Sequence, residues 1–195
     1  PAPDVYTTGK EMTQIMDTFT KMNGNNYSPG TITGKPIPVG GSLARNVATG
    51  LGNAYCIREA AKILNIELKG AKVVLQGFGN ASTFSGEYLE KMGATCIAAS
   101  DSKGSILVPD GFKVQELIDW KQKEGSVVGY PGSKEISTEE LLTTECDVLV
   151  PGALENQITA EIAEKLQCKI IGEAANGPTL PEADPILHKK GVFVI

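Results

Sequence analysis

The segment 71–101 constrains the fold of this chain more than any other part of its sequence. It begins with the apolar run AKVVLQ, passes through the glycine-rich turn Gly77-Phe78-Gly79-Asn80, and continues as a helix-like segment to about Met92. It ends in a second apolar run, ATCIAAS, which is followed by Asp101. This order predicts two parallel strands joined by a helix, with an acid at the end of the second strand.

A dinucleotide-binding site requires the same order of elements. Gly77 can form the tight turn, and Gly79 lets the backbone approach a pyrophosphate, whose negative charge the helix N-terminus then stabilises. Asp101 follows Gly79 by about 20 residues, the spacing that places a carboxylate on the adenine ribose hydroxyls. Because that carboxylate would repel a 2′-phosphate, the sequence favours NAD as the cofactor over NADP.

Simpler interpretations compete with this one. Glycine-rich turns are common and usually reflect backbone geometry alone, and in that case Asp101 would only cap a turn. Ser82 also departs from the usual pattern, in which Gly or Ala lets helix and strand pack closely; we expect its hydroxymethyl group to be accommodated by a small shift. We favour dinucleotide binding because strand, turn, helix, strand and acid all occur in the expected order.

The composition excludes several classes of function. The 195 residues include 18 Lys and Arg against 23 Asp and Glu, a net charge of −5, and no basic run stands out. Nucleic acid is therefore not an expected partner. The apolar runs are too short to cross a membrane, and the start carries no signal-peptide pattern. We expect a cytoplasmic protein that buries one core and has no membrane partner.

The cysteines and the single histidine do not predict a metal site. The histidine, His188, lies beside two lysines on an expected surface helix. Without a second histidine or a cluster of ligands, no metal is predicted. Three of the cysteines lie in or beside apolar runs, so reduced and buried thiols are expected. The four cysteines, which form no C-x-x-C pair, are Cys56, Cys96, Cys146 and Cys168.

Helical and strand-like patterns alternate along the chain. Residues 9–22 and 47–65 carry apolar side chains at helical spacing, whereas residues 23–45 have the composition of a loop. A turn is expected at Pro109-Asp110-Gly111, and Ser137 opens a capping-box pattern. Further helices are expected around 114–125, over 158–166 and from Pro181, and strands at 72–76, 94–101, 147–150, 169–172 and 192–195.

Five strands that alternate with helices predict an α/β fold of the doubly wound, Rossmann-like type, with a mainly parallel sheet covered by helices on both faces. Loops near residues 77, 101, 151 and 173 then gather at one edge, where ligands bind in such sheets. Residues 1–195 are expected to form a single NAD-binding domain. Within it, residues 1–45 would supply a hinge-side helix and loop, and residues 46–195 the Rossmann-like core.

Five motifs follow one another in order along the chain: PAPDV (1–5), GGSLARNVATG (40–50), GFGN (77–80), SDSKG (100–104) and EAANGPT (173–179). Together they resemble the glutamate dehydrogenase branch of the amino-acid dehydrogenases, over essentially the whole chain. The resemblance implies reversible oxidative deamination of L-glutamate to 2-oxoglutarate and ammonia, with hydride passing to the nicotinamide. It also implies a homo-oligomer, commonly a hexamer, for the full enzyme.

The resemblance implies roles for individual residues. It makes Asp4 a catalytic proton-transfer residue and places Thr49 near the nicotinamide carboxamide, with Arg45 shaping the same region. It places Asn80 at the start of the helix after the pyrophosphate turn, and Asn176 near the nicotinamide ribose. The expected cofactor-binding residues are Arg45, Thr49, Gly77, Phe78, Gly79, Asn80, Ala81, Ser100, Asp101, Ala153 and Asn176.

Each of these roles has a structural alternative. From physical chemistry alone, Asp4 is a loop or capping carboxylate, and Thr49 at a helix start is an N-cap or a hydroxyl satisfied within the helix. Arg45 would be a solvated loop cation, and Asn176, beside Gly177, a turn residue.

The resemblance covers only part of the catalytic machinery. The family's substrate-binding lysines belong to a substrate domain that precedes these residues, and Lys10, Lys21 and Lys35 match none of its lysine motifs. The helical segment that follows the last strand in the family is missing as well. Because catalysis requires acid, base and electrostatic groups positioned together, we expect this fragment to be inactive alone.

Alternatives from other classes stay open. The chain could belong to a related leucine, phenylalanine or valine dehydrogenase, although the PAPD and GGS motifs argue against this. It could also be a nucleotide-binding module without catalysis, or a reused domain that serves as a regulator or scaffold.

Overall fold

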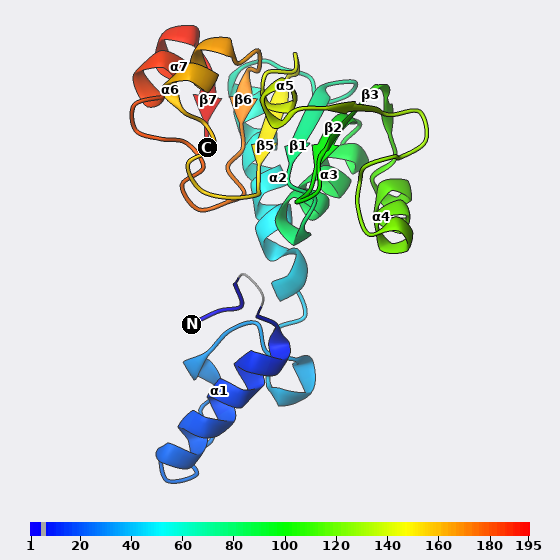
Figure 1. Cartoon of the computed structure of the whole chain (residues 1–195). Coiled ribbons are helices and arrows are strands. Elements are labelled where there is room, and N and C mark those ends of the chain that lie inside the picture. Colours follow the sequence, from blue (N-terminus) through cyan, green and yellow to red (C-terminus); the bar gives the residue numbers. More distant parts are fainter. Residues whose placement is uncertain (5–6) are drawn as a thin grey trace. The chain divides into compact units, whose positions relative to one another are not determined.

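The computed structural model describes residues 1–4 and 7–195. The chain divides into two compact units, Pro1–Ala48 and Thr49–Ile195. The first unit carries the blue end of the ribbon in Figure 1, and the second carries the sheet.

The first unit is built around one helix, α1 (Gly9–Met22), so the helix predicted at 9–22 is confirmed. Thr8 caps its N-terminus in a capping box. The Thr8 hydroxyl accepts a 3.2 Å hydrogen bond from the Lys10 N–H, and the Glu11 carboxylate accepts a 2.7 Å hydrogen bond from the Thr8 N–H. The apolar side chains of this unit that are buried are Met12, Met16 and Ile32. The stretch predicted as a loop contains two short 3₁₀ helices, η1 (Pro29–Thr31) and η2 (Ile37–Val39).

The long helix α2 (Arg45–Ile63) begins in the first unit and continues in the second. It confirms the helix predicted at 47–65, with a start two residues earlier. Asn65, in the left-handed conformation at φ 55°, follows its end. In the second unit, Ala54 and Ile57 are fully buried in the core under the sheet.

The described strands of the second unit form one sheet in the order β4-β3-β2-β1-β5-β6-β7. Its pairs are parallel except for β3, which is antiparallel to both neighbours, β2 and β4. The order of winding reverses between β1 and β5, which creates a crevice at their carboxyl ends. The strands are β1 (Lys72–Gln76), β2 (Thr95–Ser100), β3 (Ser105–Phe112), β4 (Lys134–Ile136), β5 (Val148–Pro151), β6 (Ile170–Ile171) and β7 (Phe193–Val194).

Helices cover both faces of this sheet (Figure 1). On one face, α2, α3 (Asn80–Lys91) and α4 (Val114–Glu124) bury side chains such as Leu89 and Leu117 against the strands. On the other face, α5 (Thr138–Leu142), α6 (Ala160–Lys165) and α7 (Asp184–Lys190) do the same with Leu141, Ala163 and Leu187. The predicted doubly wound α/β class with a mainly parallel sheet is therefore confirmed.

Two strands were not predicted. The expectation of five strands and of a turn at 109–111 is wrong, because those residues lie within β3, which pairs with β2. Gly111, at φ 86°, lies opposite a register shift between Cys96 and Ala98, the geometry of a β-bulge. Pro109 lies beyond the part of β3 that pairs with β4, where its missing N–H is tolerated.

Two helices begin later than predicted. Ile158 forms a bridge with Thr179 instead of entering a helix, and the hydroxyl of Thr159 caps α6. Helix α7 starts at Asp184, with Pro185 in its first turn, and not at Pro181. The capping box predicted at Ser137 is confirmed.

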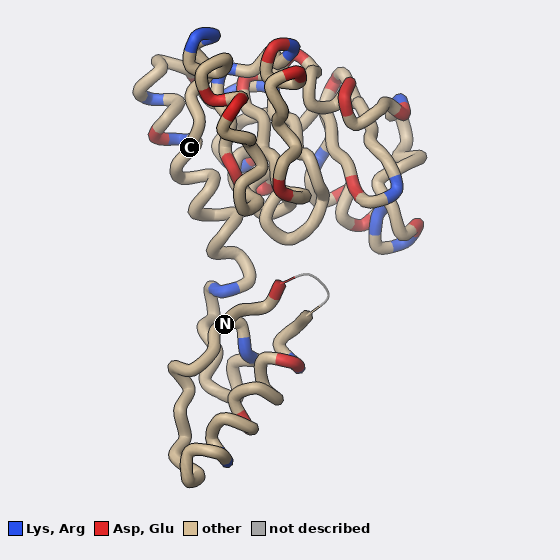
Figure 2. Tube along the Cα trace, turned by 60° about the vertical axis from the view of Figure 1, so that its left-hand side comes forward, with Lys and Arg blue, Asp and Glu red and all other residues tan. Residues whose placement is uncertain are grey.

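The cysteines are all free thiols, and Cys96, Cys146 and Cys168 are buried as expected, whereas Cys56 is exposed. Burial raises the pKa of the Cys96 thiol to about 12. His188 is exposed on α7, as predicted. Figure 2 shows the basic and acidic residues distributed over the helices and loops of the second unit.

Candidate functional site

The turn after β1 depends on a glycine at its first position. Gly77 has φ 85°, and a Cβ atom there would lie 3.0 Å from both the Gly152 carbonyl oxygen and the Ala153 nitrogen. Its N–H donates a 2.8 Å hydrogen bond to the Ser100 hydroxyl, which is buried at the end of β2. The turn is therefore held by both strands that flank β1.

The second glycine of the turn faces open space. A Cβ atom on Gly79 would meet no heavy atom within 4 Å. Gly79 is also the N-cap of α3, and no side chain bonds to the first N–H groups of that helix in the described structure. Free N–H groups and the helix dipole favour an anion at this position. The residues present therefore fit a pyrophosphate, with Asn80 and Ala81 in the first helical turn.

Ser82 packs closely between the end of β1 and the β5 loop. Its side chain is fully buried, and its hydroxyl lies 3.4 Å from the Gln76 carbonyl oxygen, to which it donates. A side chain on Gly152, across the β5 loop, would collide with the Ser82 hydroxyl. Gly152 therefore leaves the room that the Ser82 hydroxyl occupies, and the small shift expected for a serine here stays a prediction.

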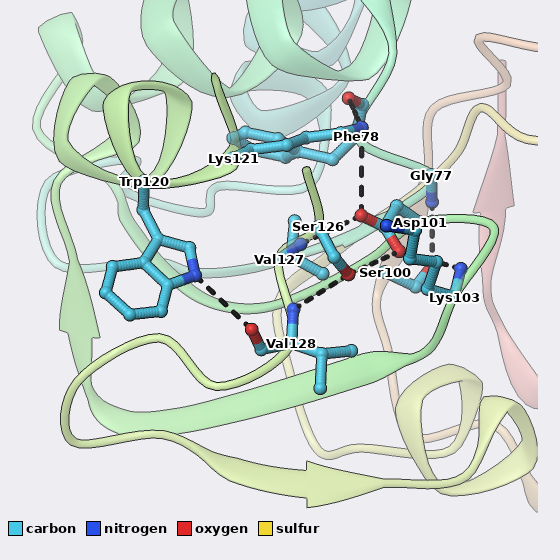
Figure 3. Close-up of polar contacts among 10 residues, drawn as sticks. All are labelled: Gly77, Phe78, Ser100, Asp101, Lys103, Trp120, Lys121, Ser126, Val127 and Val128. Atoms are coloured by element: carbon cyan, nitrogen blue, oxygen red, sulfur yellow. Dashed lines mark hydrogen bonds and ion pairs between the residues drawn. The ribbon is translucent and has the colours of Figure 1, made fainter. Parts of the chain in front are cut away.

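Asp101 lies at the centre of a hydrogen-bond network at the end of β2 (Figure 3). Its Oδ1 accepts from the Lys103 N–H at 2.8 Å and from the Ser126 hydroxyl at 3.2 Å. Its Oδ2 accepts from the Val127 N–H at 2.8 Å. The side chain is only 5% exposed. The carboxylate thus holds the loop before β3 against the segment after α4, as the turn-capping alternative predicts.

The charge of Asp101 is stabilised in this network. Burial alone would raise the pKa of its carboxyl group, but the hydrogen bonds it accepts and the nearby ammonium group of Lys121 hold the pKa below its ordinary value. A carboxylate with these partners has little capacity left for further hydrogen bonds, since its two oxygens accept at about four positions.

Lys121, on α4, was not predicted as a site residue. Its Nζ donates a 2.8 Å hydrogen bond to the Phe78 carbonyl oxygen and lies 3.9 Å from Asp101 Oδ2. It therefore connects the glycine-rich turn to the acid at the end of β2, as Figure 3 shows. No local motif marks this lysine, because the contact joins residues that are distant in the sequence.

A cavity of about 520 Å³ opens beside the turn, between α3 and α4. Its walls include apolar and polar side chains and the backbone of Gly79. A cavity of this size, adjacent to an anion-binding helix N-terminus, can hold part of a nucleotide. The lining residues from the turn and from α4 are Phe78, Gly79, Asn80, Gln115, Ile118, Lys121 and Gln122.

Helix α2 approaches α3 closely at Gly50. A Cβ atom there would lie 2.6 Å from the Ala81 carbonyl oxygen and 2.7 Å from the Ser85 nitrogen, and the Gly50 carbonyl accepts from the Ser85 hydroxyl at 3.2 Å. This contact places the exposed Thr49 beside the start of α3. Thr49 lies within the helix, so the N-cap alternative for it is wrong.

The loops after β5 and β6 lie against each other at the same edge of the sheet. The N–H groups of Ala174 and Ala175 both donate to the Pro151 carbonyl at 3.0 Å, and the Gly152 N–H donates to the Gln76 carbonyl at 2.8 Å. The loops carry Ala153 and Asn176, both exposed.

The remaining predicted residues, Asp4 and Arg45, belong to the first unit. Asp4 is exposed, and its N–H donates to the Thr7 hydroxyl at 2.8 Å. The structure thus brings together the predicted cofactor-binding residues of the second unit, around the carboxyl ends of β1, β2, β5 and β6.

Membrane-spanning helices and metal clusters are both absent from the described residues. None of their helices has the length and apolarity needed to span a bilayer. Within residues 1–4 and 7–195, no three His, Cys, Asp or Glu side chains cluster in a way that could hold a metal ion.

Comparison with known proteins relates this chain to one family. A sequence model of the glutamate/leucine/phenylalanine/valine dehydrogenases matches residues 40–195. The chain is 43% identical over its whole length to an NAD-specific glutamate dehydrogenase of Clostridioides difficile, and 45% identical to a glutamate dehydrogenase of Thermotoga maritima. It covers 47% of each of these relatives, so it spans about half of their length.

Solved structures give the same relationship. The chain superimposes on the hetero-hexameric glutamate dehydrogenase of Thermus thermophilus with a TM-score of 0.90 at 32% identity, covering 100% of this chain and 45% of that one. The glutamate dehydrogenase of Plasmodium falciparum gives a TM-score of 0.87 at 29% identity, covering 100% of this chain and 44% of that one.

Proposed function

The chain belongs to the glutamate/leucine/phenylalanine/valine dehydrogenase family, and from this premise we propose that it is the NAD(H)-binding part of a glutamate dehydrogenase. The reaction proposed for the whole protein is the reversible oxidative deamination of L-glutamate to 2-oxoglutarate and ammonia. The name of the Clostridioides difficile relative, an NAD-specific glutamate dehydrogenase, supports both the substrate and the cofactor.

The observation that carries this proposal is the open space at Gly79. A fixed turn, an uncapped helix N-terminus and a position where a Cβ meets no atom within 4 Å occur together there. These are the features that a pyrophosphate needs. The cavity beside the turn provides room for the adenosine half of a dinucleotide.

In this proposal the bound cofactor supplies the hydride acceptor, and the residues of this chain bind and orient it. The N–H groups at the start of α3, including those of Asn80 and Ala81, hold the pyrophosphate. The backbone of Ala153, in the loop after β5, lies against the turn. Thr49 and Asn176 contact the nicotinamide half of the cofactor. Arg45 shapes the same region, and Asp4 transfers the proton to or from the substrate.

The selectivity for NAD is proposed to depend on Asp101 and Lys121 together. Asp101 presents a negative charge near the end of β2, which disfavours a 2′-phosphate. Lys121, at 3.9 Å, partly neutralises that charge. Because the carboxylate already accepts hydrogen bonds from the loop, we propose that it acts on selectivity mainly through its charge.

The groups that hold glutamate are proposed to lie outside these 195 residues. The relatives are about twice as long as the matched region. The Thermus thermophilus relative is a hetero-hexamer, and we propose that the whole protein is an oligomer, a homohexamer, as well. Its location in the cytoplasm stays a prediction.

Calorimetric titration of the chain with NAD and with NADP tests the proposal. We expect weak but measurable binding of NAD, with ADP competing for the same site, and weaker binding of NADP. A chain that bound neither NAD nor ADP would refute the proposed function. Equal or tighter binding of NADP would refute the role of Asp101.

A further inference from the structure

Asn53 connects helix α2 to the loop that follows β6. Its Nδ2 donates a 3.2 Å hydrogen bond to the Glu173 carbonyl oxygen, at the beginning of the loop 173–178. A Cβ atom on Gly172 would lie 2.6 Å from Ile57 Cδ1 and 3.2 Å from Asn53 Nδ2, so helix and strand end approach closely here. The Asn53 side chain is the polar contact within this close approach.

Gln76 makes a similar connection on the other face of the sheet. It is the last residue of β1, directly before Gly77, and is only 2% exposed. Its Nε2 donates a 2.7 Å hydrogen bond to the Oε1 of Gln157, in the loop after β5. The phosphate-binding turn and the β5 loop are thus joined by a pair of amide side chains.

Gln157 in turn holds the far end of the loop 173–178. Its N–H donates to the Pro178 carbonyl at 2.7 Å, and the Ile158 N–H donates to the same oxygen at 2.8 Å. The Asn156 N–H donates to the Gly177 carbonyl at 3.0 Å. Asn53 therefore acts at the first residue of this loop, and Gln76 acts on the last through Gln157.

Both amides leave an oxygen atom unpaired. Asn53 Oδ1 and Gln76 Oε1 are buried and accept no hydrogen bond from any described residue. An unpaired buried acceptor destabilises the folded state, and an apolar side chain of the same shape would avoid that cost. A role in stability alone therefore does not explain these two amides, whereas a role in holding the loop does.

We propose that Asn53 and Gln76 are positioning residues that fix the two ends of the loop 173–178, so that Asn176 is held where the bound dinucleotide needs it. This inference rests on the proposed function, because it assigns the loop to the nicotinamide half of the cofactor. ADP lacks that half, so its binding is independent of the loop. The two amides act on the affinity for NAD and leave the affinity for ADP unchanged.

The variants Asn53→Leu and Gln76→Leu test the proposal in the 195-residue chain. We expect their thermal unfolding midpoints to equal or exceed that of the unchanged chain. Amide hydrogen exchange over 173–178 should become faster, while exchange in β1 stays the same. By calorimetry, the affinity for NAD should fall about tenfold, or about 1.4 kcal/mol, and that for ADP should change less than about twofold.

Three further variants control for packing and chemistry. Gln167→Leu makes the same change on an exposed side chain that bonds to the Thr143 carbonyl, outside the loop, and should leave both affinities unchanged. Gln157→Leu should weaken NAD binding as Gln76→Leu does. Gln157→Glu keeps an acceptor for Gln76 Nε2 and should bind NAD as tightly as the unchanged chain does.

The outcomes separate the positioning role from the proposed function. Amide exchange over 173–178 that stays unchanged in both Asn53→Leu and Gln76→Leu would overturn the positioning role. A parallel loss of stability, ADP affinity and NAD affinity in these two variants would overturn it as well. The amide exchange of the variants could also become faster although the unchanged chain binds neither NAD nor ADP. This result would refute the proposed function and the role of the loop in binding. It would establish only that the two amides hold the loop.

Discussion

The N–H of Gly77 donates a 2.8 Å hydrogen bond to the hydroxyl of Ser100, across the carboxyl ends of β1 and β2. The glycine-rich turn is thereby attached to β2, the strand that ends directly before Asp101. One buried hydroxyl thus sets the spacing between the proposed pyrophosphate and ribose positions.

Replacing Ser100 by alanine should destabilise the domain. The Gly77 N–H would lose its acceptor, and an unsatisfied buried donor costs about 1–3 kcal/mol. Urea denaturation measures the free energy of unfolding, with Ser102→Ala, at an exposed position, as the control. A Ser100→Ala chain as stable as the control would show that the bond does not hold the turn.

The two glycines of the turn should respond to substitution in opposite ways. Gly79→Val should abolish NAD binding with little change in stability, because the side chain enters the space reserved for the pyrophosphate. Gly77→Ala should cost roughly 1–2 kcal/mol of stability, because an L-residue is strained at φ 85°. Circular dichroism and calorimetry on the same samples separate the effects. Retained NAD binding by Gly79→Val would place the phosphates elsewhere.

Asp101 should make the domain sensitive to acid. The pKa of its carboxyl group is lowered in the folded chain, so its stabilising contribution is complete above the unfolded-state pKa of about 4 and is lost as the pH falls through the lower folded-state value. Between about pH 6 and about pH 3, unfolding by urea should show a larger loss of stability in the unchanged chain than in Asp101→Asn. If the stability of the two chains changed with pH in parallel, Asp101 would not be the source of the acid sensitivity.

Lys121→Met should increase the discrimination against NADP. Removing the ammonium group leaves the Asp101 charge unneutralised, so the affinity for NADP should fall roughly tenfold more than that for NAD, or about 1.4 kcal/mol. Lys123→Met, on the same helix and exposed, is the matched control. Equal losses of affinity for NAD and NADP would show that Lys121 does not affect selectivity and only binds the Phe78 carbonyl.

The chain alone should not reduce NAD with glutamate, although Asp4 is present. A proton-transfer carboxylate acts only within hydrogen-bond reach of a held substrate, and losing positioning removes roughly 7–11 kcal/mol of barrier lowering. Absorbance of NADH measures this activity. Turnover that Asp4→Asn abolished would mean that the substrate site lies within these residues.

The strand, turn and helix between Lys72 and Lys91 were predictable because their signals are local. Apolar spacing marks the buried faces, and Gly77 meets a backbone requirement that few other residues can meet. β3 was not predicted because its local signal is misleading. Pro109 and Gly111 are typical of a turn, and only pairing with β2 makes them part of a bulged strand.

The sequence by itself determined the class of fold, the glycine-rich turn after β1 and the family, since these depend on residue types at short spacings. The tertiary structure alone decided that Asp101 accepts hydrogen bonds from Ser126 and Val127 and that Lys121 reaches the turn. It also decided that Asn53 reaches the Glu173 carbonyl and that Gln76 reaches the Gln157 side chain. The physical reason is that a hydrogen bond requires two groups within about 3 Å of each other, and for residues distant in sequence only the packing of the sheet and helices sets that distance.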